Sequence, residues 1–379
     1  MNYVLICVAT LLFWSNSHII MPVLPKYTLH LGVDGKYIGL INGIFNSSFL
    51  IRPFVGKECD RRGRKTVYII GLILLSIAAF GYGLAPSFFC ILLFRFFHGV
   101  GWAACSTSSN TIAADLIPAE RRGEGISYYG MFSTLAQAGA PALGLSLIET
   151  HSYKTVFMVS MTLAVAAILV SLPLKLKTFS CSSVADNAQG PLFDKRAFKV
   201  SALMFFLAIS YGGLITFTAL CADDRGIGNI SPFFLVYAFS IMIARLKVGR
   251  YYDTKGPTLI IALSMPALFI SNVLMACANS LMMFCISGII FGIGYGSLQP
   301  TLLALSVKGI EPERRGTVNG TVMSAFDLGI GIGSTLLGVV ANYGGYLIMY
   351  MTASLAPLTG LILFLIWNRS GIVKSTDDC

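Results

Sequence analysis

Long apolar runs, separated by short polar stretches, follow one another along the whole chain. Each run has about the 20 residues that a helix needs to cross the hydrocarbon core of a bilayer. Lipid offers no partner for backbone polar groups, and the runs show no polar–apolar alternation, so we expect helices and not a barrel. The first run lacks a basic leading segment and a small-residue cleavage site, so it is expected to be a span and not a signal. The twelve predicted spans cover residues 3–25, 37–57, 66–85, 87–112, 124–148, 153–174, 199–221, 231–252, 257–277, 279–306, 317–341 and 345–367.

The charged residues fit a membrane protein and predict its orientation. Only 12% of the 379 residues are charged, about half the share of an ordinary soluble domain. Of the 27 Lys and Arg residues, 20 fall on one side of the predicted spans, four on the other and three inside spans. By the positive-inside rule the rich side is cytoplasmic and both termini lie there. The predicted location is the inner or plasma membrane, and since the net charge of +10 follows from topology, nucleic-acid binding has no support.

Two polar stretches with the same layout lie 193 positions apart. "IRPFVGKECDRRGRKTVY" covers residues 51–68, and "ARLKVGRYYDTKGPT" covers residues 244–258. The triplet 121–123, Arg-Arg-Gly, also recurs 193 positions later, at 314–316. The matched positions of the two stretches are Arg52, Gly56, Asp60 and Gly63 with Arg245, Gly249, Asp253 and Gly256.

The repeat predicts two pseudo-symmetric six-helix bundles. We expect the first over residues 1–174 and the second over residues 199–379, with a cytoplasmic linker over 175–198. Parallel repeats of this kind are typical of transporters that bind their substrate near the midplane, between two rocking halves.

Three segments resemble motifs of the major facilitator superfamily. "GKECDRRGRK" at 56–65 resembles its motif A, and "RFFHGVGWAA" at 95–104 is similar to its motif B, with His98 where glutamine is usual. "AQAGAPALGL" at 136–145 resembles motif C of the antiporter branch and keeps its proline, Pro141. The resemblance implies an all-α membrane protein with twelve transmembrane helices. It also implies a secondary transporter like the drug and metabolite exporters that exchange substrate for protons.

In this family the motif A cluster is thought to latch the cytoplasmic side, formed in one state and broken in the other. Asp60 lies just before the third span, where a helix N-terminus favours an anion and where arginines are close enough to pair with it. The alternative, that the basic residues only set the orientation, stays open. The predicted gating residues are Gly56, Asp60, Arg61, Arg64, Arg245, Gly249 and Asp253.

Two charged residues inside predicted spans are the candidates for proton coupling. Arg95 lies about eight residues into the fourth span, where a cation costs about 2.5–3.5 kcal/mol and must face protein or water. Asp327 lies near the middle of the eleventh span, where loss of solvent favours the protonated carboxyl group. We expect the two to exchange protons or charge with the substrate, although each has a structural alternative as a buried, paired side chain.

Polar side chains inside other spans are candidates for a substrate site. Each has the alternative role of a hydrogen bond between helices, which is common in membranes and worth about 0.6 kcal/mol on average. For His98 the alternative of a hydrogen-bonded packing residue is favoured. The candidates are Asn16, His18, Asn42, Asn46, His98, Gln137, Tyr211 and Gln299.

Other function classes find little in the sequence. The chain has no G-x-x-x-x-G-K-[S/T] loop, so ATP is not the direct energy source. Neither a nucleophile with a base nor a cluster of metal ligands stands out, so we expect no enzyme activity, no metal and no cofactor. The expected partners are a small-molecule substrate, protons and lipid, with the protein as a monomer. Two alternatives remain: an importer working by symport or uniport, and a membrane receptor built on the same fold.

Overall fold

The computed structural model describes residues 1–117, 122–176, 194–308, 310 and 315–369, and over these residues it is entirely helical. The elements up to the polar linker are α1 Asn2–Ile20, α2 Val23–His30, η1 Gly35–Tyr37, α3 Ile38–Asn46, η2 Ser47–Leu50, α4 Arg52–Arg62, α5 Arg64–Leu84, α6 Phe88–Leu116, α7 Arg122–Thr150 and α8 Tyr153–Ser171. Those after it are η4 Lys195–Ala197, α9 Phe198–Asp224, α10 Ser231–Lys255, α11 Pro257–Cys277, α12 Leu281–Val307 and α13 Arg315–Arg369.

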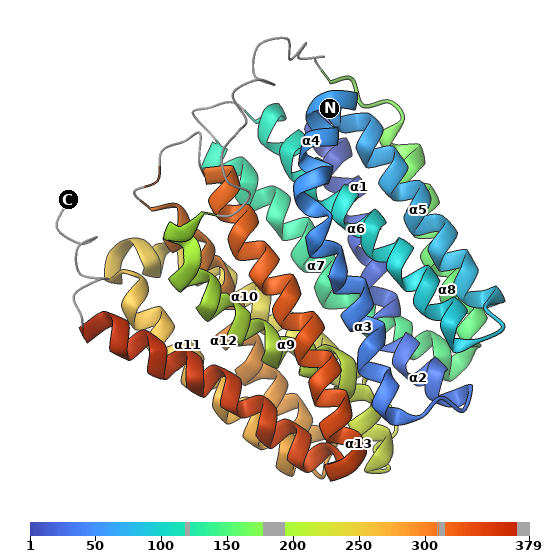
Figure 1. The fold of residues 1–379 in the computed structure, drawn as a ribbon, viewed down its shortest axis with the longest axis vertical. Helices are drawn as coiled ribbons and strands as arrows, with labels where there is room; N and C mark the ends of the chain where they lie inside the picture. The colour runs from blue at the N-terminus through green and yellow to red at the C-terminus, as the bar shows by residue number, and fades with distance from the viewer. Residues whose placement is uncertain (118–121, 177–193, 309, 311–314, 370–379) are drawn as a thin grey trace.

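Ten helical stretches of the described residues are long and apolar enough to cross a membrane. The second predicted span is not among them, because the short 3₁₀ segment η2 divides it into α3 and α4. Conversely, α13 has 55 residues and breaks at Gly345, whose φ of 73° is not helical. A straight helix of that length would extend about 80 Å, and the chain instead turns back on itself there (Figure 1). With these two adjustments the described helices accommodate the twelve predicted spans.

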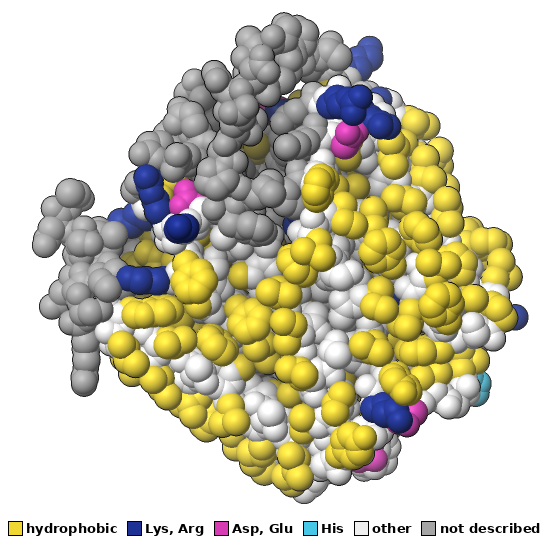
Figure 2. Space-filling view, viewed as in Figure 1, with side chains coloured by type: hydrophobic (Ala, Val, Ile, Leu, Met, Phe, Trp, Pro, Cys, Tyr) yellow, Lys and Arg dark blue, Asp and Glu magenta, His cyan; other side chains and the backbone are white. Residues whose placement is uncertain are grey.

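The surface between the helix ends is apolar, as a lipid-facing surface must be. Figure 2 shows hydrophobic side chains spread across the visible face, with Lys, Arg, Asp and Glu gathered near its two ends. Leu135 on α7 and Leu263 on α11 are 55% and 61% exposed. The interior, by contrast, holds polar groups such as Arg95 and Asn42, which are fully buried.

The two ends of the bundle are distinguished by the chain termini. We call the end where α1 begins and where α8 gives way to α9 the terminal face, and the end near Gly345 the far face (Figure 1). Helices α1–α8 form the N-terminal half of the described chain and α9–α13 the C-terminal half. The predicted domain limits at 174 and 199 stay a prediction.

Local backbone geometry repeats with the same offset as the sequence. Gly63 before α5 and Gly256 before α11 both have positive φ, of 87° and 73°, a conformation that favours glycine. Ser87 caps α6 by accepting from the Cys90 amide, and Ser280 caps α12 by accepting from the Met283 amide. The sequence repeat therefore has a counterpart in the turns and caps of the two halves.

The halves meet closely at the far face. A Cβ added to Gly39 on α3 would lie 2.1 Å from the Ser334 carbonyl oxygen on α13, so only glycine allows this approach. Lys26 Nζ and Asp223 Oδ2 form an ion pair of 2.8 Å between α2 and α9. These contacts close the far face in this structure.

Candidate functional site

An ion pair between α4 and α13 joins the two halves inside the bundle. Arg52 Nε donates to Asp327 Oδ2 at 2.6 Å, and these side chains are only 14% and 6% exposed. Arg52 also donates from Nη1 to Ser106 Oγ on α6 at 3.1 Å. Each of two charges this deeply buried would be costly without the other. We call Arg52, Asp327 and Ser106 the Arg52 bridge.

A second arginine, Arg245 on α10, reaches across the halves in the opposite direction. Its Nη1 donates to Thr134 Oγ1 on α7 at 2.5 Å, and its Nη2 donates to Gln299 Oε1 on α12 at 2.7 Å. Both acceptors are neutral, and Arg245 takes part in none of the ion pairs of the described residues. We call Arg245, Thr134 and Gln299 the Arg245 bridge.

A group of polar and aromatic side chains lies beside the Arg245 bridge. Gln137 Nε2 donates to the hydroxyl oxygens of Tyr211 and Tyr295, at 2.9 and 3.4 Å. The two tyrosine rings stack with centroids 4.7 Å apart, and Tyr295 lies one helical turn before Gln299 on α12. The structure thus brings together Gln137, Tyr211 and Gln299, three of the predicted substrate residues, around one partly buried arginine.

Arg95 lies in a different place, within the N-terminal half. Its Nη2 donates to Asn42 Oδ1 at 2.6 Å, and its Nε donates to the Ile41 carbonyl oxygen at 3.3 Å. The guanidinium lies 4.2 Å from the ring centroid of Phe45, a cation–π contact. Asn42 donates in turn to Thr216 Oγ1 on α9 at 2.7 Å, which links this cluster to the C-terminal half.

Arg95 and Asp327 were expected to act together, but their hydrogen bonds and ion pairs in the described residues go to other partners. Arg95 lies about two turns into α6, counted from the far face, whereas Asp327 lies about five turns from the break at Gly345. The bonds of Arg95 go to Ile41 and Asn42 on α3, about three turns before Arg52 in the second span. Arg52, and not Arg95, is the arginine that pairs with Asp327.

The two histidines predicted for the substrate site are held by neighbouring side chains. His98 bonds through Nε2 to Ser17 Oγ at 3.1 Å and through Nδ1 to the Tyr82 hydroxyl at 3.0 Å. His18 Nδ1 lies 3.0 Å from the Trp14 carbonyl oxygen, and its ring stacks on that indole. Both side chains are buried, with their bonds directed at protein.

The two remaining asparagines also bond to protein. Asn16 Nδ2 donates to Ser160 Oγ and to the Ser160 carbonyl oxygen, at 2.8 and 2.9 Å, which joins α1 to α8. Asn46 Nδ2 donates to the Asn42 carbonyl oxygen at 2.8 Å, within its own segment. A role in substrate binding stays a prediction for both.

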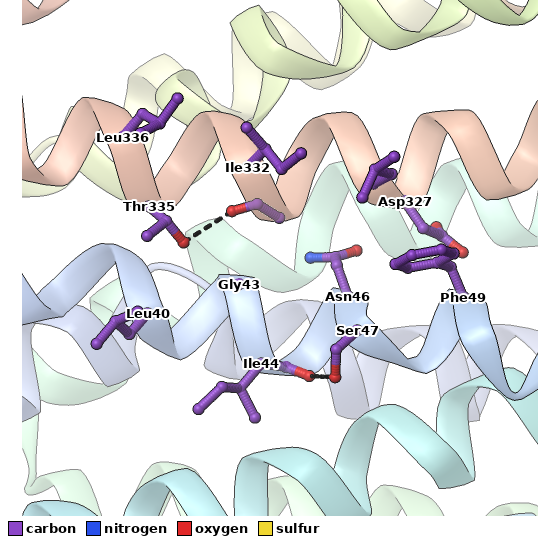
Figure 3. Close-up of a pocket in the computed structure, with 12 residues that line it drawn as sticks. Leu40, Gly43, Ile44, Asn46, Ser47, Phe49, Asp327, Ile332, Thr335 and Leu336 are labelled. Atoms are coloured by element: carbon purple, nitrogen blue, oxygen red, sulfur yellow. Dashed lines mark hydrogen bonds between the residues drawn. The ribbon is translucent and has the colours of Figure 1, made fainter.

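A crevice of about 340 Å³ runs between the second and eleventh spans, one from each half (Figure 3). Its walls are mostly apolar and include Leu40 and Ile44 of α3 and Ile332 and Leu336 of α13. At one end the carboxyl group of Asp327 lies beside the ring of Phe49 and near Asn46 (Figure 3). The Arg52 bridge therefore borders an opening between the halves.

Part of the predicted latch falls outside the described residues. Nothing is described of the side chains of Gly56, Asp60 and Asp253. Of the two arginines expected near Asp60, Arg61 pairs with Glu58 at 3.6 Å, and Arg64 pairs with Asp115 at the end of α6. Gly249 is exposed, and a Cβ there would meet nothing within 4 Å. The latch stays a prediction.

The sequence pattern alone did not indicate Arg52 and Thr134 as members of the site. Arg52 is only a matched position in the layout of the repeat, and Thr134 is one of many hydroxyl residues inside the spans. A signal was nevertheless present, because moving each member of the Arg245 bridge by 193 positions reaches Arg52, Ser106 and Asp327.

The arrangement around Asp327 can respond to protons. As a carboxylate it attracts Arg52 across the interface of the halves, and as a carboxylic acid it loses that Coulomb attraction. One proton therefore changes the strength of a contact between two bodies. Among the described residues no group of three or more His, Cys, Asp or Glu side chains is arranged to hold a metal ion.

Comparison with known proteins gives the same picture over the full length. The model of the Major Facilitator Superfamily matches residues 6–278 and 234–375. The staphylopine export protein of Staphylococcus aureus is 24% identical over 97% of this chain and 95% of its own. The quinolone resistance protein NorA of the same species is 23% identical over 94% of this chain and 93% of its own.

Solved structures share the fold at low sequence identity. A mutant form of the nucleoside transporter NupG superposes with a TM-score of 0.80 at 13% identity over 97% of this chain and 99% of its own. A bacterial homologue of the human lysosomal transporter Spinster, in an inward-facing and occupied conformation, gives 0.74 at 18% identity over 97% and 96%. These likenesses concern the arrangement of helices.

Proposed function

The chain belongs to the Major Facilitator Superfamily, and from this premise we propose that it exports a small solute in exchange for protons by alternating access. It is a membrane transporter and not an enzyme, as its relatives and structural neighbours are. The direction is supported by two relatives, one named for staphylopine export and one for quinolone resistance. Those cargoes differ, so neither is assigned to this chain.

The single observation that carries proton coupling is the ion pair between Arg52 and Asp327. Both charges are removed from water, so their mutual attraction contributes to holding α4 against α13. Protonation of Asp327 leaves a neutral acid facing a cation, which weakens the contact. The halves then separate more readily on the side nearest the bridge.

The depth of the bridge determines which side that is. Arg52 lies about three turns from the end of α4 at the terminal face and about four turns from the start of α3 at the far face. Opening at the terminal face must therefore break the bridge, while the Gly39 contact with Ser334 keeps the far face shut. The cycle alternates between a state with the bridge formed and a state open to the terminal face.

We place the terminal face in the cytoplasm of a cell whose inner or plasma membrane holds the protein. The support is the distribution of Lys and Arg along the sequence. In this orientation the bridge opens toward the side from which cargo for export is taken. Proton entry from outside and release inside would then drive the solute outward.

The test combines cargo discovery with measured flux. Metabolites that accumulate in cells lacking the gene, compared with cells expressing it, identify the cargo and its direction. Inside-out vesicles should take up that cargo when their lumen is acidified, and uptake should collapse with the pH gradient. A cargo that is instead depleted in the knockout and enters right-side-out vesicles would identify an importer.

Asp327→Asn is the informative variant, because asparagine keeps the shape of the side chain and cannot release a proton. We expect it to abolish gradient-driven uptake while exchange of labelled for unlabelled cargo continues. Asp224→Asn is the matched control, since that carboxyl group is exposed at the end of α9. If Asp327→Asn still concentrates cargo as the parent does, the coupling assignment is wrong.

A further inference from the structure

The two arginine bridges occupy equivalent positions of the internal repeat. Arg52 and Arg245 are 193 positions apart, and so are their acceptors within the same half, Ser106 and Gln299. Their acceptors in the opposite half, Asp327 and Thr134, are separated by the same number. Six residues thus form two copies of one arrangement, each with an arginine that reaches across the interface.

The copies differ in charge at a single position. Where Asp327 supplies a carboxylate to Arg52, Thr134 supplies a hydroxyl to Arg245. Thr134 Oγ1 donates its own proton to the Gly130 carbonyl oxygen at 2.8 Å, so toward Arg245 it acts as a neutral acceptor. The first arginine has its counter-charge within the protein, and the second does not.

Arg245 also retains an unused donor. Its Nε is buried without an acceptor, although Nη1 and Nη2 are both bonded. A buried cation is costly unless an anion pairs with it and its remaining protons are accepted. Arg245 and Gln299 keep partial exposure, so the site is not sealed from incoming molecules.

The surroundings favour a particular kind of anion. The guanidinium fork is matched to the two oxygens of a carboxylate. Beside it, the buried rings of Tyr211, Tyr295 and Phe326 form one aromatic cluster, with centroids 4.7 to 6.5 Å apart. Gln137 holds the hydroxyl ends of the two tyrosines. An organic acid would pair its charge with Arg245 and place its apolar part beside this aromatic cluster.

We propose that Arg245 is the receptor for the carboxylate of the transported solute, an organic acid. The substrate carboxylate takes the place that Asp327 fills in the other half. This assignment rests on the proposed transport function and adds the chemical class of the cargo. It also gives the two arginines different tasks, proton-linked closure for Arg52 and substrate binding for Arg245.

Three probes with one ring and different charges test the proposal: phenylacetate, phenylacetamide and phenethylamine, which are anionic, neutral and cationic at pH 7. Binding to the purified full-length protein in lipid nanodiscs is measured by calorimetry at one pH, with no gradient. We expect phenylacetate to bind at least tenfold more tightly than its amide, and the amine not at all. Equal binding of the three, or no binding of phenylacetate, overturns the proposal.

Two variants locate the effect. Arg245→Gln should reduce phenylacetate affinity to that of the amide, and Thr134→Asp should do the same by giving Arg245 an internal partner, as Arg52 has. The second variant keeps the arginine and adds an ion pair, so it remains informative if the first does not fold. Thr134→Asn has nearly the same shape as Thr134→Asp without its charge, so it should bind phenylacetate more tightly than Thr134→Asp does. Undiminished binding by Thr134→Asp contradicts the proposal.

The outcomes separate this assignment from the proposed function. Anion-selective binding that depends on Arg245 can be present even if Asp327→Asn leaves gradient-driven flux unchanged, and then only the coupling scheme fails. If flux depends on Asp327 while phenylacetate and its amide bind alike, only the substrate class fails.

Discussion

Separating Arg52 from Asp327 by mutation should open the terminal face, and removing both charges should largely restore closure. The variants are Arg52→Gln, Asp327→Asn and the double substitution. Removing one member of a buried ion pair leaves the other charge unpaired, which costs about 3–5 kcal/mol. Since the two side chains retain 14% and 6% exposure, we take the lower limit, about 3 kcal/mol.

That energy acts on the equilibrium between bridge-formed and open states. In the open state water hydrates the unpaired charge. Each single substitution therefore destabilises the closed state and leaves the open state nearly unaffected. At about 1.4 kcal/mol for each factor of ten, the open-to-closed ratio rises about 150-fold. In the double variant two neutral amides face each other and no charge is stranded, so the ratio should return to within about tenfold of the parent.

The distance between the halves at the terminal face reports this ratio. Spin labels at Thr66→Cys on α5 and Phe198→Cys on α9, both exposed, span the two halves in a background without the nine native cysteines. Pulsed dipolar spectroscopy in nanodiscs then gives the population at each distance. Lys36→Gln is the control, because its ion pair with Asp34 is solvent-exposed at the far face and should leave the distances unchanged. Equal populations in all four proteins, or a double variant as open as the sum of the singles, would refute the reasoning.

Three further predictions concern the other contacts between elements. Gly39→Ala should shift the equilibrium toward a far-face-open state by about 1–3 kcal/mol, because the added Cβ would overlap the Ser334 carbonyl oxygen. Spin labels on the two halves at the far face should then show a longer distance. An unchanged distance would count against the contact. Arg95→Gln should lower the melting temperature and leave the labelled distances at the terminal face unchanged, because Arg95 bonds within its own half. A change in those distances would show that Arg95 has a gating role. Lys26→Gln should change the free energy of unfolding by less than about 1 kcal/mol, and by less still at high salt, because Asp223 is half exposed. A larger loss, measured by denaturation in detergent, would mean that the ion pair is better shielded from solvent than its exposure indicates.

The helices were largely predictable because lipid imposes a simple rule on length and polarity. The span predicted at 257–277 coincides with α11, and that predicted at 231–252 differs from α10 only at its C-terminal end. The 3₁₀ break over Ser47–Leu50 was not predicted, because hydrophobicity does not distinguish two kinds of helical turn. The reversal near Gly345 was predicted as a loop, and the positive φ of one glycine achieves it without a polar stretch.

The site was predictable in its members more than in its contacts. Asp327 stood out because an ionisable group inside a span is rare and needs a partner, whereas Arg245 was a matched position of the repeat. Which partner it finds depends on how the two halves face one another, and a hydrophobicity pattern within one half contains no such information. Arg95 and Asp327 were therefore linked by their chemistry, although their depths differ. The offset of the repeat relates Arg245 to Arg52, and it relates the acceptors of Arg245 to those of Arg52 only once the contacts of Arg245 are known.

The contact of Gly39 with the Ser334 carbonyl also bears on how far the second span moves when it tilts. Two backbones that touch there without intervening side chains form a pivot, from which the second span extends as a lever as far as Arg62. Such a lever is about 35 Å long at 1.5 Å per residue, so tilting it by about ten degrees displaces its tip by roughly 6 Å. A small tilt of the second span about Gly39 should therefore open its terminal-face end by about the width of a benzene ring.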